Sequence, residues 1–327
     1  MSKYSVQVIE GVDAVSAVEQ NISSQVRVFQ TTRWLSIVGS SLKTITCTDE
    51  SGTMKGYLPL VKSSKFKIKG YHVPPYTPYS GPVFLEKDIY KKAEIAEALI
   101  RPLFAEKHLD FVVRIEDGDL IPFSRLGFSI NARQTHVVNR SVTYDINQIH
   151  SSKRRYLKKL LENLNSGNFT VRKGVDAVPD LLILNQKTEE RAGFKGNSAI
   201  LSQLVHEFAS TETVLVIYSK EGQPLAGAFC PRDDAYAYHL INASDRSTDN
   251  LLDKANLLST YLMVQSAISS GLSFDFEGSN IPGIANFYRM MGGTPTINFR
   301  LQKSRSTLFG FMRAIQQMRT EQYAGGR

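Results

Sequence analysis

Two acidic residues in the final third of the chain are the first candidates for chemistry. Asp275 and Glu277 alternate with Phe274 and Phe276, and this alternation predicts a strand that carries both carboxylates on one face. A carboxylate in a low-dielectric cleft has a raised pKa, which suits a general base. The same two residues could instead cap a helix that begins near Ile281. A catalytic role and a structural role therefore both stay open.

Tyr288 and His239 are further candidates in the same half of the chain. Tyr288 is either a proton donor to a leaving group or an aromatic residue packed on the sheet. His239 shares a predicted strand face with Ala237 and Ile241, where a single histidine is more often a hydrogen-bonded core residue. We assign Tyr288 with Asp275 and Glu277 to the catalytic set, and His239 to substrate binding.

A proline-rich segment in the first half contributes aromatic candidates. The run PPYTPYSGP, residues 74–82, is incompatible with a helix and predicts an extended loop. Its Tyr76 and Tyr79, together with Trp34, are expected to wall a binding site, because loops on a rigid scaffold often carry one. Asn280 and Lys195 complete the substrate-binding set, although a plain surface lysine is the simpler interpretation of Lys195.

Length and charge limit the class of protein. The chain has 327 residues, 42% of them hydrophobic, a formal net charge of +8 and a pI near 9.3. This length favours two domains, and the charge favours an anionic partner. No apolar run approaches the ~20 residues that a membrane-spanning helix needs. The N-terminal segment has no signal-peptide pattern, so we expect a cytoplasmic protein.

Neither the cysteines nor the basic clusters require a catalytic role. Cys47 and Cys230 lie in strand-like runs without a nearby metal-ligand spacing, so they are expected to be buried and no metal site is predicted. A basic amphipathic helix is predicted from Ser151 or Ser152 to Leu164. It is either a solvated linker helix or a surface for RNA or an anionic membrane. A second amphipathic helix is predicted from Leu308 to Met318.

The two halves repeat the same order of predicted elements. Residues 42–47 and 55–61 read as a hairpin, followed by the loop, a helix over 88–107 and a strand over 109–115. The second half has a hairpin over 213–218 and 225–230, a third strand over 235–242, a helix that Gly271 ends, and a strand over 272–276. The motif FSRLGF at 123–128 also resembles FYRMMG at 287–292. This repetition favours an internal duplication.

The chain resembles the FemAB-like and CelD-like acyltransferases of the GNAT superfamily. The resemblance rests on the run FDFEGSN at 274–280 with the residues that follow it to Pro295, on FQTTRWL at 29–35, and on the stretch 59–82. It implies an α/β fold of two tandem GNAT-like domains, each a mostly antiparallel mixed sheet flanked by helices. We expect an N-terminal domain over 1–148, and a linker helix with the C-terminal domain and its final helix over 149–327.

The resemblance also implies an activity. An N-acyltransferase or aminoacyltransferase would move an acyl group from acyl-CoA or aminoacyl-tRNA to an amine of a cell-envelope precursor or a metabolite, without a tightly bound cofactor. The turn after the third strand bears on the donor, since enzymes that use acetyl-CoA have a glycine-rich turn there. Residues 243–254 contain no glycine and three aspartates. This departure and the basic charge favour aminoacyl-tRNA, although CoA stays open.

Two other classes of function stay open. One is a non-catalytic GNAT-fold binding module, because one copy of a duplicated fold often loses its activity. The other is a protein that assembles on RNA or makes peripheral contact with a membrane. We also predict that the N-terminal domain binds no donor, because residues 111–119 lack the Gly-Ser-Asn of the second copy.

Overall fold

The computed structural model describes residues 3–11, 16, 26–39, 41–65, 68–114, 116, 119–246, 254–278 and 281–305. The predicted C-terminal helix at Leu308–Met318 lies outside these residues. By contacts the chain forms two compact units: unit 1 contains Met1–Gln134 and Ile297–Arg327, and unit 2 is Thr135–Thr296. Among the described residues, no helix has both the length and the apolar character needed to cross a bilayer.

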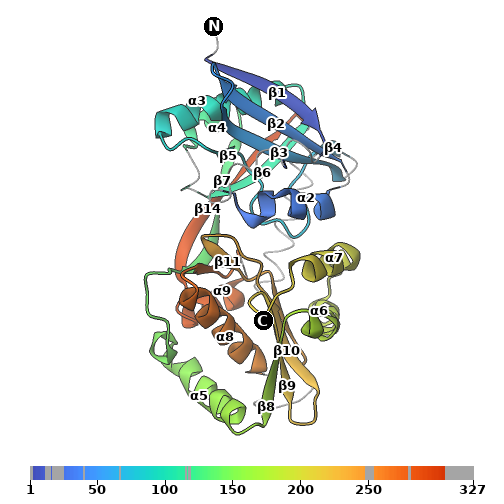
Figure 1. Ribbon diagram of the computed structural model, residues 1–327, viewed down its shortest axis with the longest axis vertical. Helices are drawn as coiled ribbons and strands as arrows, with labels where there is room; N and C mark the ends of the chain where they lie inside the picture. Colours follow the sequence, from blue (N-terminus) through green and yellow to red (C-terminus); the bar gives the residue numbers. More distant parts are fainter. Residues whose placement is uncertain are drawn as a thin grey trace. The chain divides into compact units, whose positions relative to one another are not determined.

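Unit 1 is built on a mostly antiparallel sheet (Figure 1). Neighbouring strands pair in the order β1, β2, β3, β4, β6 and β14, and only the β4–β6 pair is parallel. A short strand, β5, pairs with β3. The bounds are β1 Tyr4–Glu10, β2 Leu42–Asp49, β3 Met54–Lys65, β4 Ile68–Tyr71, β5 Val83–Phe84, β6 His108–Arg114 and β14 Thr294–Ser304.

The β2–β3 hairpin forms where the sequence predicts it. An Asp49 carboxylate oxygen accepts hydrogen bonds from the backbone N–H groups of Ser51 and Thr53, each at 3.0 Å. Gly52 adopts a φ of 82°, which a residue with a side chain rarely takes. The turn is thus fixed by local chemistry, and it sets the register of the two strands.

Helices cover the sheet of unit 1. Helix α3 (Ile89–Ile100) is capped by Asp88, which accepts from the N–H of Tyr90 at 2.9 Å. Its Ile95 and Leu99 pack into a core shared with the strands. The remaining helical segments are η1 Val28–Gln30, α2 Thr32–Val38, η2 Arg101–Leu103 and α4 Ile121–Arg125.

Unit 2 contains two groups of strands. One pairs β7 (Ser129–Val138) with β13 (Ser273–Asp275), and β13 with β11 (Tyr236–Tyr238). The other is a four-stranded antiparallel sheet in the order β12, β10, β9 and β8. Its bounds are β8 Phe169–Lys173, β9 Val214–Ser219, β10 Pro224–Phe229 and β12 Ile241–Ser244.

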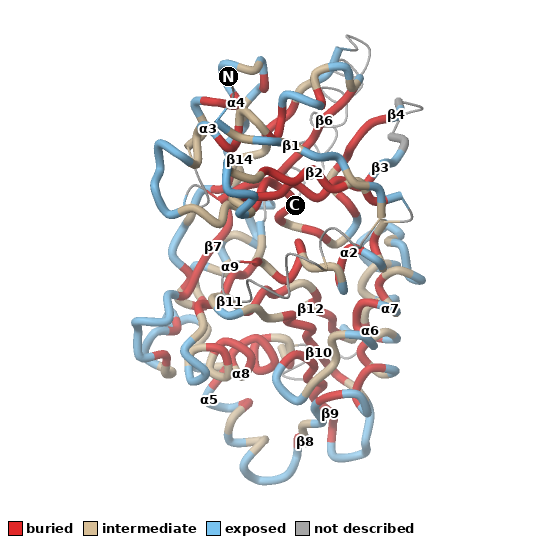
Figure 2. Tube along the Cα trace, turned by 45° about the horizontal axis from the view of Figure 1, so that its top comes forward, coloured by how far each residue is buried: buried red, intermediate tan, exposed pale blue. Residues whose placement is uncertain are grey.

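Helix α8 (Ala255–Ser269) is the central helix of unit 2. Nine of its residues are buried, and Figure 2 shows most of its trace as buried. Helices α5 and α8 lie on one side of the four-stranded sheet, and α6 and α7 lie on the other (Figure 1). The helical segments are η4 Ile146–Gln148, α5 Ser151–Asn165, η5 Val175–Ala177, α6 Val178–Ala192, α7 Ser198–Phe208 and α9 Pro282–Met290.

The predicted repetition of element order is confirmed. The series α3, β6, α4, β7 in the first half corresponds to α8, β13, α9, β14 in the second. The final strands are exchanged, because β14 pairs with β6 in unit 1 and β7 pairs with β13 in unit 2. The compact units therefore divide within β7 and β14. The domain boundary between 148 and 149 stays a prediction about the repeat.

The predicted third strand, 235–242, is wrong as a single element. It forms two strands, β11 and β12, which belong to different sheets. At the break, the N–H of His239 donates to the carbonyl of Asp275 at 2.8 Å, whereas the N–H of Leu240 donates to the carbonyls of Tyr238 and Phe229. The backbone thus leaves one sheet for the other at His239.

Candidate functional site

Asp275 occupies the end of β13 and is fully buried. Its Oδ1 accepts a hydrogen bond from the hydroxyl of Thr135 at 2.5 Å and one from the backbone N–H of Glu277 at 2.9 Å. A buried carboxylate is costly unless hydrogen bonds compensate it, and these contacts do so. Asp275 is thereby placed to hold the next two residues in position.

Glu277 lies just beyond the strand. Its φ of 63° is in the left-handed region, which is unfavourable for a side-chain-bearing residue. The expectation that Asp275 and Glu277 project from one face of a strand is therefore wrong, because β13 ends at Asp275. The strained backbone is held by the bond to Asp275, and such strain is concentrated at functional sites. Glu277 itself is half-buried.

Tyr288 comes to this site from α9. Its ring stacks on Phe276, with ring centroids 4.7 Å apart. Burial, and then the negative charges of Glu277 and Asp275, raise the pKa of Tyr288 well above its ordinary value of 10. The phenol therefore stays protonated at neutral pH. The two carboxylates and the tyrosine of the predicted catalytic set are thus neighbours.

His239 lies at the junction of the two sheets. It is 4% exposed, and its ring centroid is 5.4 Å from Phe274, 6.0 Å from Phe276 and 6.5 Å from Tyr288. Burial lowers the pKa of His239 to about 3, so the imidazole is neutral. Among the described residues, neither ring nitrogen has a hydrogen-bond partner.

Two residues of this site were missed in the sequence. Thr135 and His136 are buried in β7, and the ring of His136 lies 6.0 Å from that of Tyr288. Burial, followed by the charge of Arg289, lowers the pKa of His136. These residues lie about half a chain length from Asp275, and only the pairing of β7 with β13 brings them together. Local sequence patterns carry no signal for such a pairing.

The predicted aromatic residues lie in unit 1. Trp34 is fully buried, and its indole N–H donates to the hydroxyl of Thr77 at 3.1 Å. Tyr79 is also buried, and its hydroxyl accepts from the side-chain amide of Asn298 at 2.9 Å. Tyr76 is half-buried with a φ of 53°. The structure thus gives Trp34 and Tyr79 places in the core, and their role in an acceptor site stays a prediction.

Lys195 and Asn280 are the remaining two predicted binding residues. Lys195 is exposed in the loop between α6 and α7. Asn280 lies outside the described residues. The two cysteines are buried, as predicted, and burial raises the pKa of Cys47 to about 11. These thiols are protonated at neutral pH and are poor nucleophiles.

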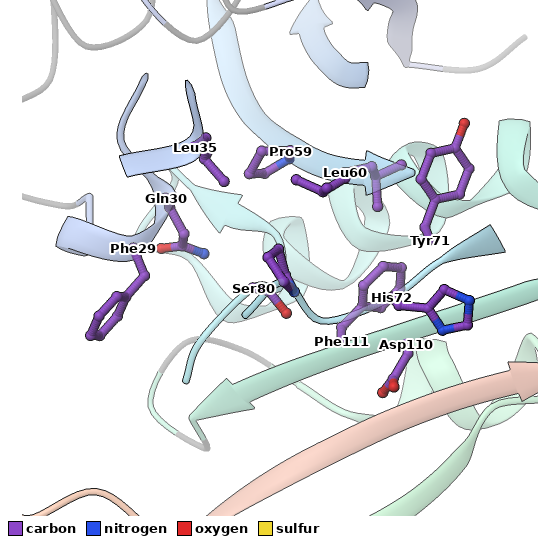
Figure 3. Close-up of a pocket in the computed structure, with 12 residues that line it drawn as sticks. Phe29, Gln30, Leu35, Pro59, Leu60, Tyr71, His72, Ser80, Asp110 and Phe111 are labelled. Atoms are coloured by element: carbon purple, nitrogen blue, oxygen red, sulfur yellow. The ribbon is translucent and has the colours of Figure 1, made fainter. Parts of the chain in front are cut away.

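A separate small cavity lies in unit 1. Figure 3 shows the side chains around it, which include Gln30, His72, Ser80 and Asp110. Its volume is about 10 Å³, which suffices for about one water-sized particle. An acyl donor or acceptor is far too large for it.

Two basic side chains of unit 2 lie beside the ring of Tyr156. Lys254 precedes the helix, and its ammonium group lies 4.8 Å from the ring centroid of Tyr156. The guanidinium group of Arg155 lies 5.4 Å from the same ring. Asp245, one of the three aspartates in the preceding turn, is neutralised by Lys187 at 2.6 Å. Lys254 at the N-terminus of α8 and Arg155 on α5 are thus two cations beside one ring, an arrangement that favours an anion.

One family model matches part of the chain. Residues 150–287 match the family model described as an acetyltransferase (GNAT) domain. This range contains His239, Asp275 and Glu277 and ends one residue before Tyr288. No curated protein matches the sequence significantly.

Solved structures with the same fold cover almost the whole chain. The crystal structure of FemX has a TM-score of 0.66 and 14% identity, with 90% of this chain and 96% of that one aligned. L-PGS from Bacillus licheniformis has a TM-score of 0.59, 12% identity and coverages of 93% and 96%. The C-terminal domain of a putative lysylphosphatidylglycerol synthetase from Agrobacterium fabrum also has a TM-score of 0.59 and 12% identity, with coverages of 93% and 95%.

Proposed function

We propose that this chain transfers an acyl or aminoacyl group to an amine. The proposal starts from the match of residues 150–287 to the GNAT acetyltransferase domain. The observation that carries the proposal is the cluster at the junction of the two sheets of unit 2. There the ring of Tyr288 lies 6.5 Å from that of His239, the residue at which β11 and β12 separate, and the negative charge of Glu277 raises the pKa of Tyr288. A candidate acid, a candidate base and a neutral imidazole are thus grouped near the place where the chain passes from one sheet to the other.

Each residue has a role in the proposed reaction. The amine attacks the acyl carbonyl carbon, and Glu277 accepts the proton that the nitrogen loses. The bond between the acyl carbon and the donor's sulfur or oxygen then breaks, and the Tyr288 hydroxyl gives its proton to that leaving atom. Asp275 positions Glu277 through its hydrogen bond to the Glu277 backbone. The products are an amide and a free thiol or alcohol.

We propose an anionic donor, either acyl-CoA or aminoacyl-tRNA. Lys254 at the start of α8 and Arg155 on α5, which both lie beside the ring of Tyr156, support this proposal, since each donor carries phosphate groups. The absence of glycine from the turn at 243–254 favours aminoacyl-tRNA. An amine-bearing cell-envelope precursor is our proposed acceptor, and a metabolite amine is the alternative.

Thermal unfolding with a panel of ligands tests the donor. The purified protein is melted with CoA, acyl-CoAs, charged tRNA and uncharged tRNA at one fixed salt concentration. A ligand at 100 times its dissociation constant stabilises by about 2.7 kcal/mol and raises the Tm by several degrees. A shift with charged tRNA alone supports aminoacyl transfer, and a shift with acyl-CoA alone supports acyl transfer.

A second measurement separates catalysis from binding. Transfer of an isotope-labelled acyl group to a panel of amines is followed by mass spectrometry for wild type and Glu277→Gln. Loss of product with an unchanged ligand-induced Tm shift supports the proposed base. Equal product formation by both proteins rules out that role. A Tm shift without any transfer in wild type would favour the binding-module alternative.

A further inference from the structure

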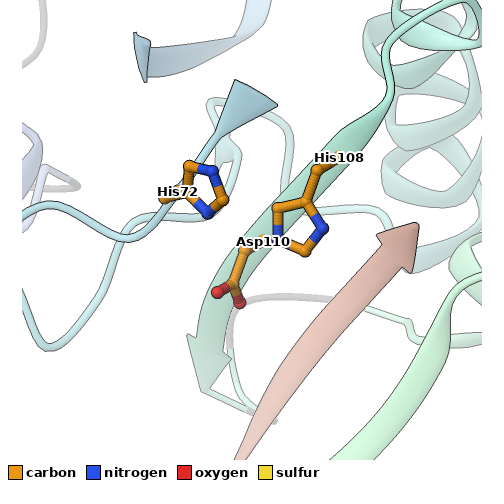
Figure 4. Close-up of side chains that lie close together, drawn as sticks. All are labelled: His72, His108 and Asp110. Carbon is orange, nitrogen blue, oxygen red and sulfur yellow. The ribbon is translucent and has the colours of Figure 1, made fainter. Parts of the chain in front are cut away.

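Three potential metal ligands are buried together in unit 1. His72, His108 and Asp110 are at most 6% exposed, and their ligand atoms all lie within 4.8 Å of one another. Figure 4 shows the two imidazole rings side by side with the Asp110 carboxylate next to them. The ring centroids are 4.5 Å apart. Imidazole and carboxylate groups are, with cysteine thiolates, the usual protein ligands of Zn²⁺.

The local fold explains why these side chains meet. His108 and Asp110 are two residues apart on β6, so they share one face of the strand. His72 directly follows Tyr71, which pairs with Leu109 in the parallel β4–β6 ladder. The sequence does not show that these three side chains are close, because a proline-rich loop and a helix separate His72 from His108. A spacing search for metal ligands therefore cannot detect it.

The neighbouring strand supplies a further polar group. Gln302 on β14 is directly opposite Asp110 in the antiparallel register, so its side chain is on the same face. Gln302 is 5% exposed, and neither atom of its amide has a hydrogen-bond partner among the described residues. A buried amide without partners is costly. Its oxygen is suited to complete a set of four ligands with the two imidazoles and the carboxylate.

The cavity beside these three side chains has room for about one water molecule or one metal ion. His72 and Asp110 line the cavity of about 10 Å³ described above (Figure 3). From these observations we infer that His72, His108 and Asp110 bind one transition-metal ion of the Zn²⁺ type, with Gln302 as the fourth neighbour. Ligands of tetrahedral zinc lie about 2.0–2.2 Å from the ion. The most distant pair of ligand atoms therefore closes together on binding.

Arg300 determines which ions the site accepts. Its guanidinium group donates to both oxygens of Asp110: Nε donates to Oδ1 at 2.7 Å, and Nη2 donates to Oδ2. Each oxygen keeps a second lone pair for an ion. Because Arg300 already balances the charge of Asp110, binding rests mainly on the imidazoles. This favours Zn²⁺, Co²⁺, Ni²⁺ or Cu²⁺ over Mg²⁺ and Ca²⁺, which prefer several oxygen ligands.

Titration of the full-length, chelator-treated protein with Co²⁺ tests the inference. We expect one equivalent to bind with the visible absorption of four-coordinate Co²⁺, Zn²⁺ to displace it, and Mg²⁺ to have no effect. His72→Gln should weaken Co²⁺ binding by more than the roughly 10–100-fold that loss of an outer-shell partner costs. His206→Gln is the matched control, because His206 is exposed on α7 and should leave the bound equivalent intact.

A second measurement covers the case in which His72→Gln does not fold, as judged by circular dichroism. In the Co²⁺-loaded wild type, proton NMR should show two hyperfine-shifted imidazole N–H signals, one from each ligand histidine. Failure of the wild type to bind an equivalent, an equivalent that persists in folded His72→Gln, or fewer than two such signals would each overturn the inference. If the wild type binds no Co²⁺, an ordered water occupies the cavity instead.

Discussion

At the scale of single residues, Tyr288 is the most direct test of the proposed chemistry. Tyr288→Phe should lower kcat by about 10²–10⁴-fold, because the leaving group loses its proton donor. Its raised pKa keeps the phenol protonated, so Tyr288 should cause no loss of rate as the pH rises to about 10. The measurement is the rate of amide formation between pH 6 and 10. Tyr90→Phe, at an 81% exposed tyrosine, is the control. Similar rates for both variants would exclude Tyr288 as the acid.

Gly293 tests how tightly the site is packed. A Cβ there would lie 3.0 Å from the Cβ of His136, from a ring carbon of Phe276 and from the carbonyl oxygen of Tyr288. Gly293→Ala should therefore lower the free energy of unfolding by about 1–3 kcal/mol, as overpacking does. The check is chemical denaturation.

Gly283→Ala is the matched control for that variant. No atom lies within 4 Å of its added Cβ, and the residue is in helix α9. It should leave stability unchanged or raise it by up to about 1 kcal/mol. Equal effects of the two substitutions would mean that the packing around Gly293 relaxes easily.

The sequence singled out Asp275, Glu277 and Tyr288 as one candidate set, but it did not predict their backbone conformations. Asp275, Glu277 and Tyr288 were identified from the sequence, and they are neighbours in the structure. The left-handed backbone of Glu277 was missed, because a strand pattern of alternating residues continues through it. In the structure β13 ends at Asp275, and the backbone N–H of Glu277 donates to the Asp275 carboxylate.

At the scale of elements, the junction between β11 and β12 makes stability depend on pH. His239 has a pKa of about 3 in the folded chain, against about 6.5 when unfolded. Between these values the unfolded chain binds a proton that the folded chain does not. The free energy of unfolding should therefore fall as the pH falls from about 6.5 towards 3, by up to about 1.4 kcal/mol per pH unit.

Denaturation at several pH values between 4 and 7 measures this slope. His239→Asn should flatten it relative to wild type, whatever its effect on stability at pH 7. His206→Asn should keep the wild-type slope, because His206 is exposed. If His239→Asn and wild type give the same slope, the imidazole takes up its proton in the folded protein.

The two hairpins and the helices α3, α5 and α8 were predictable because their signals are local, whereas α6 was not predicted. The turn at Asp49–Thr53 and the cap at Asp88 are formed by residues a few positions apart. The split of the predicted strand at 235–242 was not predictable. Its cause is that His239 bonds to Asp275 while Leu240 bonds to Phe229, and these partners lie in different sheets.

At the scale of the whole molecule, the exchange of β7 and β14 predicts that the two halves of the chain depend on each other. A fragment of residues 1–148 lacks β14, the partner of β6, and a fragment of 149–327 lacks β7, the partner of β13. Neither fragment should unfold cooperatively when expressed alone, and co-expression should restore a cooperative transition. Calorimetry of the fragments and of their mixture checks this.

A nicked protein separates the need for strands from the need for covalent continuity. A protease site placed at 148/149 and cut after folding should leave the Tm close to that of the intact chain, because both exchanged strands are already paired. A fragment of 149–327 that melts cooperatively by itself would contradict the expectation.

Because β14 lies near the end of the chain, unit 1 cannot finish folding until synthesis is almost complete. Residues 1–134 leave the ribosome first, yet β6 acquires its antiparallel partner only when residues 298–304 have been made. Unit 2, by contrast, is one continuous stretch of chain. The unit that starts first is therefore finished last, and until then the edge of β6 is available for wrong pairing. A nascent chain stalled before residue 298 should be the form that chaperones bind most strongly.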